Sequence, residues 1–276
     1  MKKLILCVVI FLLSFSTSAA DKTESAYERV MRTGTIKCGY NQYAPYFIKN
    51  INTGVISGIF YELTEELAKN AELKVEWVEE VSHTDIFTGL AARRYDVLCS
   101  GIWPSSARAK VGSFTVPVFY SPVMAWGRAG EARFKNLKAV NNSSIRVAVI
   151  DGAQEDIIAR TDFPKALRIA SPAMASFTDN FLKIAAGKAD ITFVEPSLIK
   201  AYVAANPGSL EQVSAEPLRF FGNTLAVAKG ETELKELLDS GLQELLDSGR
   251  VEAILQKYEI YKGSFLRVAK PYEEVK

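Results

Sequence analysis

The chain contains the stretch Tyr95-Asp-Val-Leu-Cys-Ser-Gly-Ile-Trp-Pro-Ser-Ser-Ala-Arg108, which indicates the fold class. Residues 97–99 form an apolar run with the length of a buried parallel strand, and Ser100-Gly101 is expected to end it. Pro104 and the two serines after it are typical of a helix start. Arg108 is therefore expected in the first turn of a helix that leaves the carboxyl end of this strand.

A ligand site is the functional interpretation of this stretch. In open α/β sheets, ligands bind at the carboxyl ends of strands, where helix amide groups and a guanidinium both face an anion. Arg108 then indicates a site for a carboxylate. The alternative is a solvated arginine beside a helix cap, because most arginines face water.

The first twenty residues have the features of a secretory signal peptide. Two lysines precede an apolar run over residues 4–13, and Ser18-Ala-Ala20 supplies the small residues of a cleavage site. The apolar run is too short to span a bilayer. We therefore expect a signal peptide over residues 1–20 and an exported mature chain.

Composition excludes some classes of function. The chain has 33 Lys and Arg against 32 Asp and Glu, with a formal net charge of +1, so no concentrated basic face for nucleic acid is expected. His83 is the single histidine of the sequence, which excludes a site with several histidine ligands. We expect no metal and no cofactor.

Two cysteines remain after the signal peptide, and both fall in predicted strands. Cys38 and Cys99 could form a disulfide, because an exported protein meets an oxidising environment. Two buried thiols in neighbouring strands are the alternative, and the sequence leaves both open.

Strands and helices alternate along the mature chain. Phe60, Leu63 and Leu67 recur at helical spacing and predict an amphipathic helix over residues 59–70. The order strand, helix, strand predicts a parallel sheet with right-handed crossovers. The other expected elements are strands at 35–40, 73–78, 96–100, 145–150, 189–194 and 223–229, extended segments at 112–118 and 121–127, and helices at 27–31, 85–92, from 151–156, 177–186, 234–246 and 251–258.

A second charged residue follows a predicted strand in the later part of the chain. The strand at 189–194 ends at Glu195-Pro196. Two sheets that each carry one candidate ligand group at an edge imply a cleft between two lobes. The alternative for Glu195 is a carboxylate that caps the following helix.

Six segments occur in a recognisable order. They are Gly39-Tyr-Asn-Gln-Tyr-Ala-Pro-Tyr-Phe47, Gly58-Ile-Phe-Tyr-Glu-Leu63, Asp96-Val-Leu-Cys-Ser-Gly101, Phe114-Thr-Val-Pro-Val-Phe-Tyr120, Gly187-Lys-Ala-Asp-Ile-Thr-Phe-Val-Glu195 and Leu245-Leu-Asp-Ser-Gly-Arg-Val-Glu-Ala-Ile-Leu-Gln-Lys-Tyr258. In this order and spacing, the chain resembles family 3 extracellular solute-binding proteins, the polar amino-acid receptors of ABC importers. The resemblance covers nearly the whole mature chain.

The resemblance implies an α/β protein with the two-lobe periplasmic binding protein fold, of type II-like topology, whose ligand cleft lies between lobes joined by two hinge strands. Lobe 1 would be discontinuous, with residues 21–125 plus 224–276, and lobe 2 would hold residues 126–223. The crossing strands are expected near residues 124–128 and 220–224. Because the ligand contacts both lobes only when they approach, it stabilises the closed state.

The resemblance also implies ligand-binding roles. The arginine that binds the ligand α-carboxylate in the family falls on Arg108, with Ser105 three residues before it. The acidic residue that binds the α-amino group falls on Glu195. Two aromatic positions of the family's pocket fall on Tyr43 and His83.

Departures from the family pattern bear on the ligand. Trp103 stands two residues after Gly101, where the family usually has Thr or Ser, and Ala153 follows Gly152, where the family has Thr. The missing hydroxyls remove hydrogen bonds worth about 0.5–1.5 kcal/mol each, and the indole narrows the cleft. Gly101, Trp103 and the backbone of Ala153 are still expected at the ligand. An aromatic ligand, a small amino acid and a different carboxylate all stay open.

The resemblance implies a periplasmic receptor that captures an amino acid or related carboxylate by hinge closure and delivers it to a membrane ABC permease. We expect a monomer that binds no nucleic acid. One alternative is a cyclohexadienyl-type dehydratase on the same scaffold, with Glu195 or His83 as general acid or base. Another is a ligand sensor whose closed form docks on a signalling receptor. Because the sequence shows no nucleophile–base pair, metal cluster or phosphate loop, we expect a binding protein rather than an enzyme.

Overall fold

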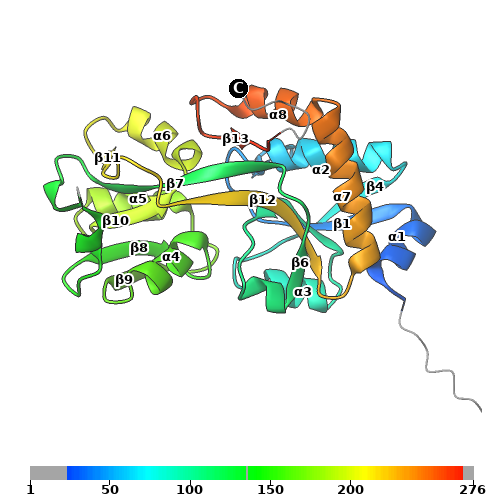
Figure 1. The fold of residues 1–276 in the computed structure, drawn as a ribbon, viewed down its shortest axis with the longest axis horizontal. Coiled ribbons are helices and arrows are strands. Elements are labelled where there is room, and N and C mark those ends of the chain that lie inside the picture. Colours follow the sequence, from blue (N-terminus) through cyan, green and yellow to red (C-terminus); the bar gives the residue numbers. More distant parts are fainter. Residues whose placement is uncertain (1–23, 135, 270–276) are drawn as a thin grey trace, which may run out of the picture.

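Two lobes joined by two long strands make up the structure (Figure 1). The computed structural model describes residues 24–134 and 136–269. The predicted signal peptide over residues 1–20 and the charged end from Lys270 lie outside these residues. Within them, no helix is both long enough and apolar enough to cross a membrane. The predicted two-lobe α/β fold is confirmed.

The first lobe is built from both ends of the described chain (Figure 1). Its earlier elements are α1 (Ala26–Thr33), β1 (Thr35–Tyr40), β2 (Ile48–Lys49), β3 (Ile56–Ser57), α2 (Ile59–Asn70), β4 (Lys74–Glu80), α3 (Ile86–Ala91), β5 (Val97–Ile102), the 3₁₀ turn η1 (Arg108–Lys110) and β6 (Gly112–Phe114). Its later elements are α7 (Thr232–Asp247), α8 (Arg250–Tyr258) and β13 (Leu266–Arg267).

The second lobe is a single run of chain between the two long strands. It holds η2 (Ala132–Phe134), η3 (Leu137–Val140), β8 (Arg146–Ile150), α4 (Gln154–Asp162), β9 (Leu167–Ser171), α5 (Phe177–Ala185), β10 (Ile191–Val194), α6 (Pro196–Ala205) and β11 (Leu210–Gln212). The strand β7 (Phe119–Arg128) leads into this lobe and β12 (Arg219–Ala228) leads back (Figure 1). The residue bounds of the lobes stay a prediction.

One twisted sheet continues through both lobes in the order β4-β1-β5-β12-β7-β10-β8-β9. In the first lobe, β1 pairs in parallel with β4 and β5. In the second, β8 pairs in parallel with β9 and β10. The two long strands pair antiparallel in the middle. As a result, the carboxyl ends of β5 and β10 approach the space between the lobes.

The helix over residues 59–70 is confirmed residue for residue as α2. Its apolar face includes Leu67, which packs with the leucines of α7 in the first-lobe core. Gly241, an interior glycine of α7, faces Leu67 closely, since a Cβ at position 241 would lie 2.8 Å from the Leu67 Cγ. The glycine therefore lets the two helices pack together, which offsets its low helix propensity.

The first crossing lies earlier in the chain than expected. Residues Phe119–Val123 of β7 pair with Arg219–Asn223 of β12. The expected crossing at 124–128 is wrong, because Met124 and the residues after it already pair with β10 and β11 of the second lobe. Pairing partners separated by many residues decide this position, and local sequence does not reveal them.

The helix expected to begin before Arg108 does not form. The strand β5 continues through Gly101 to Ile102, because Thr224 of β12 pairs with Ile102 and extends the ladder. Gly101 has a φ of 90°, and the ring of Phe60 occupies the space that a Cβ would need. Arg108 begins only the short turn η1, since β6 starts at Gly112 and leaves no room for a helix.

Cys38 and Cys99 form a disulfide between β1 and β5, with their Cα atoms 5.5 Å apart. Of the two alternatives that the sequence left open, the structure has the disulfide. It links neighbouring strands of the first-lobe core and anchors the strand that leads to Arg108.

Candidate functional site

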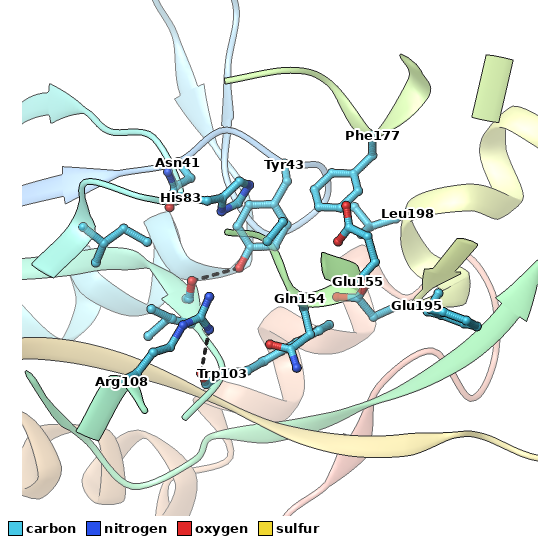
Figure 2. A pocket seen from close by; sticks show the side chains of 15 residues that line it. Asn41, Tyr43, His83, Trp103, Arg108, Gln154, Glu155, Phe177, Glu195 and Leu198 are labelled. Carbon is cyan, nitrogen blue, oxygen red and sulfur yellow. Dashed lines mark hydrogen bonds between the residues drawn. The ribbon is translucent and has the colours of Figure 1, made fainter. Parts of the chain in front are cut away.

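A pocket lies between the two lobes, where the ends of β5 and β10 meet (Figure 2). It is small, with a cavity volume of about 60 Å³. Both lobes contribute to its wall, which is lined by Asn41, Tyr43, His83, Ile86, Gly101, Ile102, Trp103, Arg108, Ala153, Gln154, Glu155, Phe177, Phe193, Glu195 and Leu198.

Seven of the eight residues singled out from the sequence line this pocket: Tyr43, His83, Gly101, Trp103, Arg108, Ala153 and Glu195. Ser105 does not line it. Its hydroxyl instead accepts the backbone N–H of Arg108 at 3.2 Å. Ser105 therefore shapes the turn that presents Arg108, and its expected ligand contact stays a prediction.

Arg108 is half-buried and holds its guanidinium across the space between the lobes. One nitrogen donates to the carbonyl oxygen of Trp103 at 2.8 Å, and another donates to the carbonyl oxygen of Gly152 at 3.1 Å. Burial lowers the pKa of Arg108 to about 10, so the group stays charged at neutral pH. In the described part of the chain, no carboxylate forms an ion pair with it, and donors remain for a ligand anion.

Glu195 follows β10 and is 2% exposed. It occupies the N-cap position of α6, but its side chain makes no capping hydrogen bond. Burial raises the pKa of Glu195 to about 8, although the Tyr46 hydroxyl opposes this rise. The side chain has no cationic partner among residues 24–134 and 136–269. It is thus suited to receive an ammonium group from a ligand.

Gln154 and Glu155, the first two residues of α4, were missed by the sequence reasoning. Both are buried and line the pocket. Burial raises the pKa of Glu155 to about 8, and the nearby charge of Glu195 adds to the rise. An acidic residue in the first turn of a helix is common, so the only sequence signal was their position directly after Gly152-Ala153.

Tyr43 and His83 form the first-lobe wall opposite Phe177 (Figure 2). The Tyr43 hydroxyl donates to the carbonyl oxygen of Gly101 at 3.0 Å. Burial and the charge of Glu195 raise the pKa of Tyr43 well above its usual value, so it stays neutral. Burial and the charge of Arg108 lower the pKa of His83 to about 4. His83 is therefore neutral at physiological pH and meets Phe177 edge to face at 6.2 Å.

Trp103 lines the pocket and is also held by the hinge strand β12. Its ring stacks on Phe221 at 4.6 Å, with 5° between the ring planes. Its Nε1 donates to Oδ1 of Asn223 at 3.0 Å. The indole is therefore a fixed wall of the pocket.

A chain of buried polar groups runs from Trp103 across both long strands to the second lobe. Asn223 donates from Nδ2 to the Ser121 hydroxyl at 2.9 Å. Ser121 shares a hydrogen bond of 2.8 Å with the Tyr46 hydroxyl, which lies 3.1 Å from Ser197 Oγ of α6. This contact and the Arg108–Gly152 hydrogen bond both connect the lobes. The structure is thus in a closed arrangement.

The described residues contain no group of three or more His, Cys, Asp and Glu side chains arranged to hold a metal ion. The pocket instead combines one guanidinium, two buried carboxyl groups and apolar walls. Such an arrangement can hold a small molecule with charges of both signs.

Comparison with known families identifies the chain. The model of bacterial extracellular solute-binding proteins, family 3, matches residues 36–260. The chain belongs to this family. The predicted resemblance is confirmed, and family 3 proteins are extracellular, in agreement with the predicted export.

Three relatives illustrate the range of this family 3 protein's similarities. A protein of Haemophilus influenzae named "Probable amino-acid ABC transporter-binding protein" is 31% identical over 44% of this chain, and the match spans only 47% of that relative. The ABC transporter arginine-binding protein 1 of Escherichia coli is 21% identical over 83% of this chain and 86% of its own length. A crystal structure of a mutant of ArgBP from T. maritima has a TM-score of 0.71 and 27% identity, covering 84% of this chain and 98% of that one.

Proposed function

We propose that this family 3 protein captures an amino acid in the periplasm and delivers it to the permease of an ABC importer. The observation that carries the proposal is the separation of charges in the pocket. Arg108 lies at one side, and Glu195 lies at the other, with the Tyr43 ring between them (Figure 2). An α-carboxylate and an α-ammonium group match these two positions.

Closure of the lobes supplies the mechanism. Arg108 belongs to the first lobe and Glu195 to the second, so a zwitterion contacts both charges only when the lobes approach. The bound ligand then stabilises the closed state by its difference in affinity for the two states. The paired segments of β7 and β12 are where we expect the hinge motion. The permease would recognise the closed form, and we propose that the receptor works as a monomer.

The names of the relatives support an amino-acid ligand, because two of them are named for amino-acid or arginine binding in ABC transport. The pocket supports a small one, since Trp103 is fixed in its wall and the cavity volume is about 60 Å³. We propose no turnover of the ligand.

The test is a binding screen of the mature protein after unfolding and refolding have removed any copurified ligand. Thermal shift over the amino acids and isothermal titration calorimetry of the hits should find at least one that raises Tm and binds with micromolar or tighter affinity. Mass spectrometry should recover the ligand unchanged. Recovery of a chemically converted ligand, or no stabilisation by any amino acid, would refute the proposal.

A further inference from the structure

The pocket contains more acidic side chains than a simple zwitterion would use. Arg108 is its one cationic side chain among the described residues, because His83 is neutral. Glu155 and Glu195 both line it. If Arg108 takes the α-carboxylate and Glu195 takes the α-ammonium group, Glu155 remains without a cation.

Glu155 is 1% exposed, and the hydrogen-bond donors to its carboxyl group are neutral. Its Oε1 accepts the backbone N–H of Ile150 at 2.9 Å and the Asn180 Nδ2 at 3.3 Å. These are neutral donors, and no described residue forms an ion pair with it. A buried carboxylate without a cation is costly, so a cationic ligand group would be strongly favoured beside it.

Gln154 gives independent evidence for a ligand group at this site. It is 9% exposed and lines the pocket. Its carbonyl oxygen Oε1 is buried and has no hydrogen-bond partner in the described chain. Figure 2 shows its carboxamide inside the pocket, between Trp103 and the two glutamates in this view. Because a buried acceptor without a donor costs free energy, this oxygen is placed to accept from a ligand N–H group.

We propose that Gln154 and Glu155 form a subsite for a second cationic group, and that the ligand is an amino acid with a short side chain that ends in an ammonium group. This inference rests on the proposed function and adds the ligand class. Glu155 supplies the opposite charge, and Gln154 supplies a neutral acceptor beside it on the first turn of α4. The small size of the pocket favours a short diamino acid.

Calorimetry with matched ligand pairs tests the subsite. L-2,4-diaminobutyrate is compared with L-norvaline, and L-ornithine with L-norleucine, because each pair differs only by an ammonium group in place of a methyl group. The refolded wild-type protein should bind at least one diamino acid 10-fold or more tightly than its neutral partner. This ratio needs no variant, so it tests the inference even if a substitution impairs folding.

Substitutions test whether Gln154 and Glu155 cause the preference for a diamino acid over its neutral partner. Glu155→Gln keeps the shape of the side chain and should reduce the affinity ratio to 2-fold or less, with norvaline binding changed less than 3-fold. Gln154→Leu should reduce the ratio by about 3-fold, because one neutral hydrogen bond is lost. Glu216→Gln is the matched control, since Glu216 is exposed in the second lobe, and it should leave the ratio unchanged.

Proton release gives a second measurement. Glu155 interacts electrostatically with Glu195 and Asp156, and Glu195 also interacts with Tyr43 and Tyr46. Arg108 and His83 line the same pocket. At pH 7 the diamino acid should release more protons than its neutral partner, because a cation beside Glu155 favours its ionised form. Titration in buffers of different ionisation enthalpy measures this difference.

The outcomes separate the two proposals. Equal affinities for charged and neutral partners, or binding of neutral amino acids alone, would overturn the subsite and leave the proposed function standing. A ratio that Glu155→Gln does not change would also overturn it. Binding of no amino acid at all would overturn the proposed function, and the subsite with it.

Discussion

The carboxyl ends of β5 and β10 both present an ionisable side chain to the pocket, but the two side chains are held differently. Arg108, after β5, donates to carbonyl oxygens of Trp103 and Gly152. Glu195, directly after β10, has no cation beside it in the described chain, and burial raises its pKa to about 8. The protein thus positions its cation by itself and leaves its anion to be satisfied by a ligand.

The chemistry of the two groups explains this difference. A guanidinium has five N–H donors, so Arg108 can keep two carbonyl oxygens and still bind a carboxylate. A carboxylate has only acceptors, and Glu195 lies at a helix N-terminus without forming a cap. Closing the pocket without a cation therefore costs free energy at Glu195. An ammonium group of a ligand removes this cost and so stabilises the closed state.

The largest effect on ligand binding is expected when Arg108, which follows β5, is replaced. Arg108→Ala removes the donors for the ligand carboxylate and should weaken amino-acid binding by about 3–5 kcal/mol, which is more than 100-fold, because the ligand anion is left buried and unpaired. Calorimetry measures the loss. Lys110→Ala, at an exposed cation on the same turn, should bind normally. A loss below 10-fold for Arg108→Ala would place the carboxylate elsewhere.

The second prediction concerns the disulfide, which anchors β5 and has no counterpart at β10 in the described chain. The disulfide ties β5 to β1, and no disulfide joins described strands of the second lobe. Replacing Cys38 and Cys99 together by serine should lower the free energy of unfolding by about 2–4 kcal/mol. Ligand affinity should change less than 3-fold, because neither cysteine lines the pocket. Urea denaturation of both proteins measures the difference, and an unchanged midpoint would contradict the prediction.

The third prediction concerns Glu195, at the end of β10, and the pH dependence of the free energy of unfolding. The pKa of Glu195 in the folded protein is about 8, above its ordinary value of 4.5. Its contribution to stability is therefore complete below pH 4.5 and is lost as pH rises toward 8. Glu195→Gln should not change the free energy of unfolding of the ligand-free protein at pH 4.5 and should raise it by about 1–2 kcal/mol at pH 9.

Chemical denaturation at the two pH values measures this effect. Glu155 keeps its own pH dependence in the variant, because its pKa is also raised to about 8. The comparison is therefore between variant and wild type at each pH. A variant that is less stable than the wild type at pH 9 would show that the Glu195 charge is satisfied without ligand.

The smallest expected effect concerns the link between lobes. Tyr46→Phe removes the hydroxyl between Ser121 and Ser197 and should weaken ligand binding by about 0.5–1.5 kcal/mol, since one hydrogen bond of the closed state is lost. Tyr61→Phe is the control on α2. Calorimetry at 25 °C resolves this change, and equal affinities for the two variants would mean that the link does not contribute to closure.

Local pattern predicted the elements that pack by one apolar face. The helix over 59–70 was predicted residue for residue, because Leu63 and Leu67 repeat at helical spacing. The strand over 35–40 was predicted equally well as β1. The helix expected at Arg108 and the first crossing were wrong, because pairing with distant strands decides both. The same limit explains the missed Glu155, whose contacts with Ile150 and Asn180 exist only in the folded second lobe.

The sequence by itself predicted the family and, through that resemblance, the two-lobe fold and seven of the residues that line the pocket. Arg108 and Glu195 also follow from local pattern, because each comes after a predicted strand, whereas Tyr43 and His83 follow only from the resemblance. Only the tertiary structure decided that Cys38 and Cys99 are joined, that Trp103 is held by Asn223, and that Glu155 shares the pocket with Glu195. These facts depend on distances between residues far apart in the chain, and such distances are set only when the chain has folded.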